Sequence, residues 1–248
     1  MPDEAAPSEE RSRSYYDEFS KRYDARRGGN EPGGYHDLID DLEVDFVKRF
    51  ATGKDLLEVG CGTGLLLARF GEFAKRAVGM DLSEGMLEHA RARGLTVEHG
   101  SATSLPFEDA SFDVACSFKV LAHIPDIDKA LVEMFRVVRP GGVVIGEFYN
   151  PHSVRALAKR LAGAQRIGGT YDEASVFTRF DTPRDVANRM PPGAELLAAR
   201  GIRIVTPAAF ALRLPVVGAL LARAERLLAD GPASRFGGFY AVAYGKPR

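Results

Sequence analysis

The stretch Asp55-Leu-Leu-Glu-Val-Gly-Cys-Gly-Thr-Gly64 decides the fold of this chain. An apolar run with β-branched character enters a loop that contains three glycines, and an apolar segment starting at Leu65 follows. This order predicts a strand, a glycine turn and a helix. Glycine adopts backbone conformations that a Cβ disfavours, and it lets a ligand lie against the main chain. The free N–H groups at the start of the following helix suit a carboxylate or a phosphate.

The spacing of the glycines narrows the kind of ligand. The dinucleotide-binding fingerprint is G-x-G-x-x-G, whereas this loop reads Gly60-x-Gly62-x-Gly64, with an acidic Glu58 just before it. A second predicted strand ends at Asp81, about 20 residues after the loop, where a carboxylate can hold the two hydroxyls of a ribose. The two signals together predict a nucleoside-containing cofactor.

The remaining pattern predicts an α/β fold. Short apolar strands alternate with helical segments of about 10 residues, which is typical of βαβ units with a parallel sheet. Ligands bind such sheets at the carboxyl ends of the strands. The further strands are expected at 96–99, 111–117, 143–149, 202–205 and 238–245, and helices at 38–50, 83–94, 125–139, from 182 onward and 212–229.

Five motifs follow one another along the chain. They are Glu58-Val-Gly-Cys-Gly-Thr-Gly64, Gly79-Met-Asp-Leu-Ser83, Leu105-Pro-Phe107 followed by Ser111-Phe-Asp-Val114, Leu121-Ala-His-Ile-Pro-Asp126 and Val138-Arg-Pro-Gly-Gly142. In this order they resemble the class I S-adenosylmethionine (SAM) dependent methyltransferases, and in particular their type 11 group, which includes ubiquinone and menaquinone C-methyltransferases. The resemblance covers roughly residues 36 to 150. It implies a Rossmann-like doubly wound sheet of seven strands, with an antiparallel last strand inserted between strands five and six, SAM as the cofactor and S-adenosylhomocysteine (SAH) as the product.

The same resemblance implies which residues hold the cofactor. The glycine loop and its acidic residue would hold the methionine portion, Asp81 the ribose, and Leu82 the adenine ring. The group usually has Asp where this chain has Ser101, and a serine hydroxyl accepts the adenine amino group only as a neutral partner. Adenine recognition is therefore expected to be weaker or to use Thr103 or a backbone carbonyl. The cofactor-binding candidates are Glu58, Gly60, Cys61, Gly62, Gly64, Asp81, Leu82, Met86, Ser101, Ala102 and Phe118.

Residues of the acceptor site are less well defined by the sequence. His123 follows the fourth strand on the active-site side, and an unperturbed imidazole titrates near neutral pH. It is the candidate for an acid/base or acceptor-orienting group, with anchoring of its own loop as the alternative. The substrate-binding candidates are Tyr15, Tyr16, Tyr23, His36 and Tyr149.

The composition pattern indicates one catalytic domain over residues 15–248, preceded by a disordered tail over 1–14. Tyr15, Phe19 and Tyr23 share one helix face, so 15–36 is expected either to pack on the domain or to act as a lid. The resemblance implies that an insert at 150–182 shapes the acceptor site. The amphipathic helix at 212–229 is expected to cover the sheet, with a role at a membrane surface as the alternative.

The charge balance and the cysteines exclude several classes of protein. The chain has 33 basic and 34 acidic residues, a net charge of −1, so nothing favours a nucleic acid partner. No apolar run approaches the ~20 residues of a membrane span, and the polar N-terminus predicts a cytoplasmic protein. Two cysteines and scattered histidines predict neither a disulfide framework nor a metal site. Cys61 and Cys116 are expected to be buried thiols.

These observations lead to one functional hypothesis and two alternatives. The first is SAM-dependent methyl transfer to O, N or C of a small, partly apolar molecule such as a natural product, a quinone or a lipid-like compound. The main alternative is a SAM-binding protein without methyltransferase activity, which would serve as a sensor or scaffold. An NAD-dependent dehydrogenase is disfavoured by the glycine spacing. The sequence predicts no particular oligomeric state.

Overall fold

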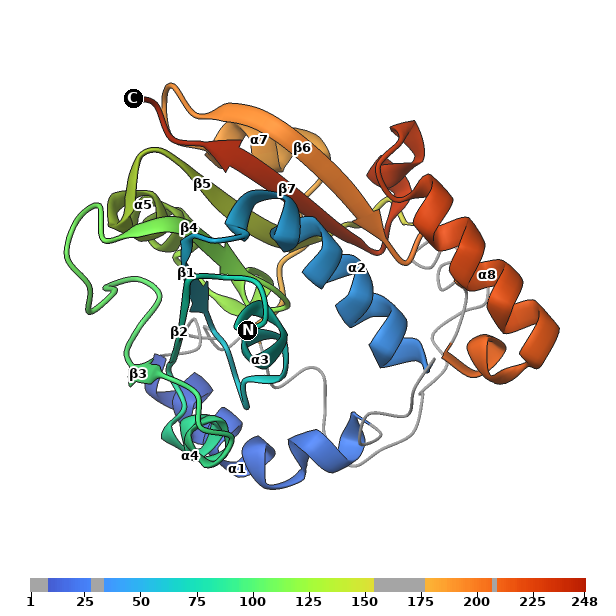
Figure 1. Ribbon diagram of the computed structural model, residues 1–248, viewed down its shortest axis with the longest axis horizontal. Coiled ribbons are helices and arrows are strands. Elements are labelled where there is room, and N and C mark those ends of the chain that lie inside the picture. The colour runs from blue at the N-terminus through green and yellow to red at the C-terminus, as the bar shows by residue number, and fades with distance from the viewer. Residues whose placement is uncertain (1–8, 28–33, 154–176, 207–208) are drawn as a thin grey trace, which may run out of the picture.

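A single seven-stranded sheet organises the residues that the computed structural model describes, which are 9–27, 34–153, 177–206 and 209–248 (Figure 1). The strand order is β3-β2-β1-β4-β5-β7-β6. β1 to β5 pair in parallel, whereas β7 is antiparallel to both of its neighbours. The predicted α/β Rossmann-like sheet, with its antiparallel last strand between strands five and six, is confirmed. The strands are β1 (Asp55–Val59), β2 (Arg76–Asp81), β3 (Val97–His99), β4 (Phe112–Ser117), β5 (Val138–Tyr149), β6 (Glu195–Ile202) and β7 (Phe239–Gly245).

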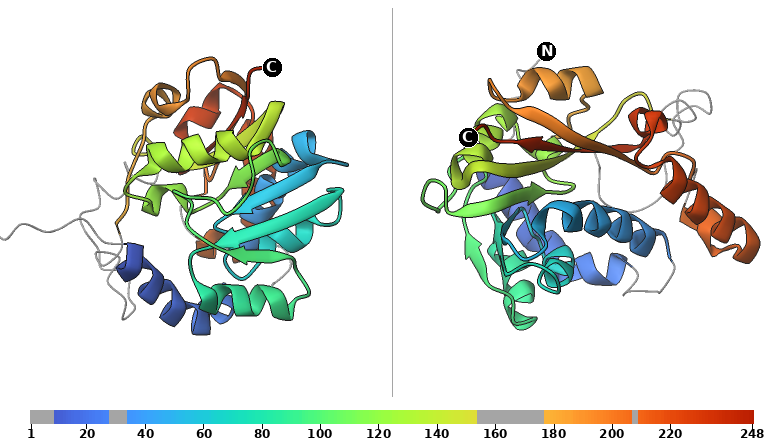
Figure 2. Two further views of the ribbon diagram at one scale, coloured as in Figure 1. Left: turned by 90° about the vertical axis from the view of Figure 1, so that its left-hand side faces the viewer. Right: turned by 45° about the horizontal axis from the view of Figure 1, so that its top comes forward.

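Helices cover both faces of this sheet (Figure 2). On one face Leu42 and Phe46 of α2 are buried with apolar residues of β1, β4 and β5. On the other face Leu131 of α5 and Val186 of α7 are buried against the opposite side of the same strands. The helices are α1 (Glu9–Arg26), α2 (Tyr35–Ala51), α3 (Leu65–Phe70), α4 (Glu84–Ala92), α5 (Ile127–Val137), α7 (Pro183–Arg189) and α8 (Pro215–Leu228), with short 3-10 turns η1 (Leu121–His123), η3 (Ala209–Arg213) and η4 (Pro232–Phe236).

Two of the predicted helices begin with side-chain caps. The Ser83 hydroxyl accepts a hydrogen bond from Met86 N at 3.1 Å and begins α4. At α7, Thr182 and Asp185 form a reciprocal capping box, with Pro183 at the first helical position. Both caps satisfy N–H groups that have no partner within the helix.

The segment Arg139-Pro-Gly-Gly142 was expected to end a helix before a strand at 143–149, and that prediction is wrong. α5 ends at Val137, and β5 already begins at Val138, opposite Phe112 of β4. The register then shifts, so that Val114 lies opposite Val143. Gly141 has φ +78°, so the glycines form an irregularity inside the strand rather than a stop after the helix.

The sixth strand lies earlier in the chain than the predicted 202–205. β6 ends at Ile202, and the N–H groups of Ile204, Val205 and Thr206 donate instead to the buried Glu225 carboxylate of α8, at 2.7–2.9 Å. Their donors are therefore occupied and do not extend the sheet. β6 lies at the edge of the sheet. Near its N-terminal end both Leu196 and Leu197 are exposed, which weakens the alternation of buried and exposed residues that marks a strand.

Helix α8 covers less of the sheet than the sequence predicts. The helix projects from the β6 side of the molecule (Figure 1). Leu221 and Ala222 pack on the core, whereas Val216, Leu220 and Leu227 are 64–74% exposed. In the part of the chain that the structure describes, no helix combines the length and the apolar character that a membrane crossing needs.

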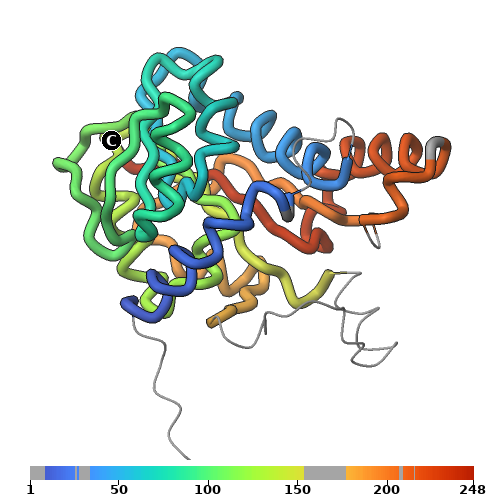
Figure 3. Tube along the Cα trace, turned by 90° about the horizontal axis from the view of Figure 1, so that it is seen from below, coloured from blue at the N-terminus to red at the C-terminus, as the bar shows by residue number. Residues whose placement is uncertain are grey.

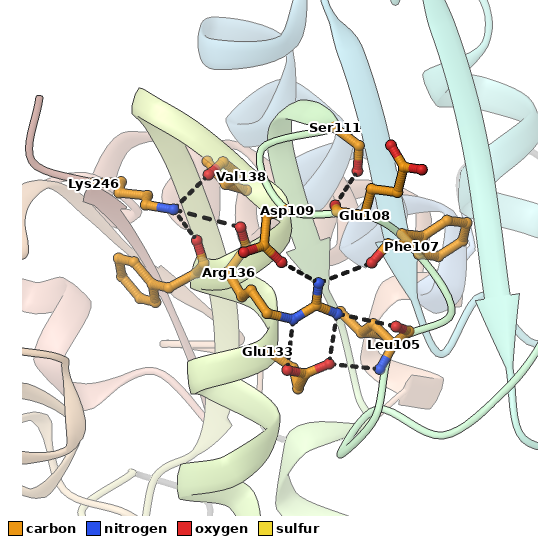
Figure 4. Close-up of polar contacts among 10 residues, drawn as sticks. Leu105, Phe107, Glu108, Asp109, Ser111, Glu133, Arg136, Val138 and Lys246 are labelled. Carbon is orange, nitrogen blue, oxygen red and sulfur yellow. Dashed lines mark hydrogen bonds and ion pairs between the residues drawn. The ribbon is translucent and has the colours of Figure 1, made fainter.

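An arginine on α5 fixes the loop between β3 and β4 (Figure 4). The Arg136 guanidinium donates to the carbonyl oxygens of Leu105 and Phe107, and to the carboxylates of Asp109 and Glu133, at 2.7–3.0 Å. Glu133 in turn accepts from Leu105 N at 2.8 Å. The Leu105-Pro-Phe107 motif is thus held by a planar fork of donors, which a lysine would not reproduce.

Some predicted segments lie wholly or partly outside the described residues. These are residues 1–8 of the predicted tail, 28–33 of the predicted lid and 154–176 of the predicted acceptor-site insert. The helix α1 begins at Glu9, so residues 9–14, which the sequence analysis places in the tail, are helical.

We predict that Glu225→Ala destabilises the protein by about 3 kcal/mol, because buried N–H groups lose their acceptor and each such loss costs about 1–3 kcal/mol before water relieves it. Urea unfolding followed by circular dichroism measures the change. Arg223→Ala, an exposed substitution on the same helix, is the control and should shift stability by no more than about 0.5 kcal/mol. Equal effects of the two substitutions would contradict the role of Glu225.

Candidate active site

A cavity of about 1170 Å³ lies at the carboxyl ends of β1, β2 and β4. Helix α1 forms one of its walls, and Figure 3 shows that helix crossing this side of the sheet. Parallel sheets place their ligands at this edge, where the loops after the strands converge. The cavity is therefore the candidate active site.

The glycine loop after β1 forms part of the cavity wall. Gly60 and Gly62 have φ values of +76° and +54°, which L side chains rarely adopt. A Cβ on Gly60 would lie 2.4 Å from a methyl carbon of Val120. At Gly62 no atom lies within 4 Å of the place where a Cβ would be, so the loop backbone is open on that side. A ligand can thus approach the main chain at Gly62.

Asp81, at the end of β2, connects this loop to α4. Its carboxylate accepts from Gly62 N at 2.8 Å and from Ser83 N at 2.9 Å. Burial raises the pKa of Asp81 above its ordinary value, although the hydrogen bonds from Ser83 and Gly62 act in the opposite direction. The carboxylate keeps acceptor capacity for a ligand, since it has about four acceptor positions.

Glu58 lies beneath the loop as a buried acid. Its side chain lines the cavity, and its Oε2 has no hydrogen-bond partner among the described residues. Burial raises its pKa well above the ordinary value. An unpartnered buried carboxyl oxygen beside an open glycine cradle fits a ligand that brings a cation, as the ammonium group of a methionine portion would. The residues present therefore fit SAM.

His123 and Tyr149 form a hydrogen-bonded pair at the other end of the cavity. His123 Nδ1 lies 2.9 Å from the carbonyl oxygen of Phe177, and Nε2 lies 3.3 Å from the Tyr149 hydroxyl. A carbonyl oxygen only accepts, so Nδ1 carries the proton and Nε2 accepts from Tyr149. Burial lowers the pKa of His123 and raises that of Tyr149. The imidazole is thus neutral near pH 7, with its lone pair toward Tyr149.

Helix α1 brings a row of aromatic rings to the cavity. Tyr15 stacks on Phe19 at 5.7 Å between centroids, and Phe19 meets Tyr23 edge-on at 5.5 Å. All three residues line the cavity, as does Tyr16, whose pKa burial raises. The stripe therefore lines the cavity, and a role of this helix as a lid stays a prediction.

Two aspartates of α1 contact the elements at the Asp81 end of the cavity. Asp17 accepts from the Ser83 hydroxyl at 2.6 Å and from Gly85 N at 3.1 Å, both at the start of α4. One turn from the end of α1, Asp24 accepts from Thr63 of the glycine loop at 2.8 Å. It also forms an ion pair with Arg93. The position of α1 is therefore tied to the elements that form the candidate cofactor site.

A buried charge cluster lies behind the acceptor end. Lys119 has φ +60°, and its ammonium group lies 2.7 Å from Glu43 and 3.3 Å from Asp40. Burial opposes its charge, but these two acids raise its pKa overall. The backbone N–H of Lys119 donates to Glu147 at 3.1 Å, and burial raises the pKa of that acid well above the ordinary value. Because Lys119 lines the cavity, this cluster places an ammonium group, paired with Glu43 and Asp40, in its wall.

Most of the predicted site residues lie in the cavity wall, and two do not. Gly64, with φ +82°, begins α3, and a Cβ there would lie 2.3 Å from Leu95. Its requirement for glycine therefore comes from packing. His36 lies at the start of α2, beside Tyr35, and is not part of the wall. The predicted residues that line the cavity are Glu58, Gly60, Cys61, Gly62, Asp81, Leu82, Met86, Ser101, Ala102, Phe118, His123, Tyr15, Tyr16, Tyr23 and Tyr149.

Sequence reasoning missed several residues of the wall, notably Glu9, Arg27, Thr63 and Lys119. Glu147 offered a signal for the charge cluster, because an acid inside an otherwise apolar predicted strand needs a buried partner. Glu9 offered none, because it lies in a polar segment far along the chain from the residues that it meets.

The comparisons with known proteins agree with this geometry. A family model described as a methyltransferase domain matches residues 57–146, from β1 into β5. A ubiquinone biosynthesis O-methyltransferase of Methylococcus capsulatus is 30% identical over 160 residues, which cover 59% of this chain and 67% of that protein. The chain belongs to the SAM-dependent methyltransferases.

Other relatives share a smaller part of the sequence. A malonyl-[acyl-carrier protein] O-methyltransferase of Serratia marcescens is 39% identical over 95 residues, which cover 38% of this chain. The chain spans only 37% of the length of the first curated relatives that it matches. The structural similarity covers more of the chain than the sequence identity does. The magnesium protoporphyrin IX methyltransferase of Synechocystis PCC 6803, solved with bound SAH, has a TM-score of 0.63 at 14% identity and covers 96% of this chain and 100% of its own.

We predict that Asp81→Asn weakens SAH binding about 10- to 100-fold. The amide leaves the N–H of either Gly62 or Ser83 without an acceptor, and it loses a charge-assisted hydrogen bond to the ligand. Isothermal titration calorimetry measures the effect. Asp113→Asn, the same change in a residue of β4 that does not line the cavity, should leave the Kd within about twofold. Unchanged affinity in Asp81→Asn would refute the assignment.

Proposed function

We propose that this chain transfers the methyl group of SAM to an O, N or C atom of a small, partly apolar molecule. The observation that carries the proposal is one continuous cavity with two chemically different ends. Its volume of about 1170 Å³ exceeds the roughly 300–1,000 Å³ of a pocket for a single ligand. There is room for a cofactor at the Asp81 end and an acceptor at the Tyr149 end.

The acceptor end favours a flat, partly apolar compound. The ring of Tyr149 lies 5.2 Å from that of Phe239 and 6.2 Å from that of Phe180. The aromatic face of α1 contributes further rings, and His123 and Lys119 supply the polar groups. A quinone-related ring, a natural product or a lipid-like molecule fits this chemistry. The ubiquinone biosynthesis relative supports the first of these classes.

The main contribution of the protein to such a reaction is alignment. SAM, when bound, would supply a methyl group attached to a sulfonium. The acceptor atom would bond to the methyl carbon in line with the carbon–sulfur bond, and sulfur would be the leaving atom. Holding the two reactants in position can remove ~7–11 kcal/mol of the barrier, compared with about 10²–10⁴-fold from a general base. Helix α1 borders both ends of the cavity, so it is suited to fix the two ligands relative to one another.

For an acceptor with an O–H or N–H group, we propose that His123 is the base that finally takes the proton of that group. As the acceptor atom forms its bond to the methyl carbon, its proton passes to the Tyr149 hydroxyl, and the Tyr149 proton passes to His123 Nε2. The hydrogen bond from Nδ1–H to Phe177 holds the imidazole in the tautomer that can accept. The electron pair of the broken bond stays on sulfur, and the imidazolium returns its proton to solvent.

We predict that SAM and SAH both bind and that methyl transfer follows. Ligand at about 100 times its Kd should stabilise the protein by ~2.7 kcal/mol, seen as a thermal shift. Radiolabelled methyl groups from SAM should then appear in an organic extract with a panel of catechols, quinols and acyl compounds. Tight binding without transfer to any acceptor would favour the alternative of a sensor or scaffold. Absence of binding in calorimetry would refute both.

We predict that His123→Ala lowers kcat/KM for a hydroxyl acceptor by about 10²-fold, the lower bound for loss of a general base, with the Kd for SAM unchanged. Tyr149→Phe should lower kcat/KM similarly, because it removes the hydroxyl and keeps the ring.

The pH profile supplies an independent test. Burial lowers the pKa of His123 below the ordinary 6.5, and the neutral form is the base. Activity of the wild type should therefore be constant above pH 6.5 and fall only at lower pH, and His123→Ala should lose that acid limb. His152→Ala, an exposed histidine outside the cavity wall, should keep it. An acid limb that persists in His123→Ala would exclude this histidine as the base.

A further inference from the structure

The first residue of α1 meets the loop after β3 at the cofactor end of the cavity. The Ser101 hydroxyl donates a hydrogen bond to the Glu9 carboxylate, across 92 positions of sequence. Both residues line the cavity, together with Leu82, Met86 and Thr103. The Ser101 loop is anchored at its far side by Arg136, which holds the backbone of Leu105 and Phe107. Glu9 thus contacts a fixed part of the site.

The hydrogen bonds of Ser101 leave it no free acceptor. Its one proton points to Glu9, so the Thr103 hydroxyl at 2.9 Å must donate to Ser101. Thr103 N also donates to Ser101 Oγ, at 3.1 Å. A hydroxyl oxygen has two lone pairs, and both are now used. Ser101 therefore cannot take the place of the aspartate that the resemblance implies at this position.

Glu9 keeps most of its acceptor capacity. A carboxylate offers about four lone-pair positions, and the bond from Ser101 uses one. The other side chains beside it at this end of the cavity are apolar (Leu82, Met86) or neutral hydroxyls (Ser12, Thr103). At this end of the cavity Glu9 supplies a carboxylate in addition to that of Asp81, where the ribose would be held.

We propose that Glu9 accepts a hydrogen bond from the 6-amino group of the adenine of SAM. The inference rests on the proposed binding of SAM in this cavity. Ser101 lies two residues after the end of β3, and β3 is the strand next to β2. The contact between Ser101 and Glu9 is therefore beside the strand end at which the ribose would be held. The exocyclic amino group of adenine is a donor, and an ionised acceptor forms the stronger bond with it. The carboxylate is supplied by α1 instead of by the loop after β3.

This assignment gives α1 a role in cofactor selection. The same helix carries Asp17 and Asp24, which hold it on α4 and the glycine loop, and the aromatic rings of the acceptor end. Adenine recognition therefore requires α1 in the position described, and a bound adenine stabilises that position by the reciprocal nature of linked binding.

The test compares two ligands that differ at position 6 of the purine. SAH has an amino donor there, whereas S-inosylhomocysteine has a carbonyl acceptor, which a carboxylate repels. By calorimetry the wild type should prefer SAH by at least about tenfold, since charged acceptors form the stronger hydrogen bonds. Glu9→Gln should bind SAH about three- to tenfold more weakly and should bind S-inosylhomocysteine no worse than the wild type, so that the preference collapses. Glu10→Gln, the same change at a neighbouring residue outside the cavity wall, should leave both values unchanged.

A rescue experiment separates recognition from a general loosening of α1. Glu9→Ala combined with Ser101→Asp restores a carboxylate at this place and should recover the preference for SAH, whereas Glu9→Ala alone should lose it. Equal losses for the two ligands in Glu9→Gln, or a preference that survives in Glu9→Ala, would overturn the role of Glu9 while leaving methyl transfer intact. Failure of the wild type to bind SAH would overturn the proposed function as well.

Discussion

The hydrogen bonds of the half-buried Asp81 carboxylate are the interaction on which the site depends. It accepts hydrogen bonds from the glycine loop after β1 and from the start of α4, so two segments that leave neighbouring strands are fixed by one side chain. Asp17 then attaches α1 to that same helix start. Loop, helix and covering wall form one connected hydrogen-bonded unit. Loss of Asp81 would therefore alter the shape of the site as well as remove the proposed contact with the ribose.

The part of this unit that is local in sequence was predictable. The spacing of Gly60, Gly62 and Asp81 predicts a glycine turn and an acid at the end of the second strand. The capping residues Ser83 and Thr182 each bond to an N–H within one helical turn. The position of β6 was predicted wrongly because its limit is set by Glu225, which takes the N–H groups of 204–206 from a distant helix. Local patterns do not carry such information.

The contact between Glu9 and Ser101 belongs to the same non-local class. The sequence shows that Ser101 departs from the usual acid of the group, but a replacement acid in a polar N-terminal segment has no periodicity or motif to mark it. Lys119 is a similar case, because its partners Glu43 and Asp40 lie on α2 and Glu147 on β5. A buried charge of this kind is strongly destabilising when one partner is removed, so the wall of the acceptor end tolerates little change.

The insertion of β7 between β5 and β6 has a consequence for the biosynthesis of the chain. Every backbone group by which β6 joins the sheet pairs with β7, yet the ribosome makes β6 first. Until residues 239–245 have emerged, β5 keeps an open edge and β6 has no neighbouring strand. Unpaired strand edges are templates for association with other chains. Between the synthesis of residue 195 and that of residue 245, the nascent protein thus exposes strand edges that β7 later covers.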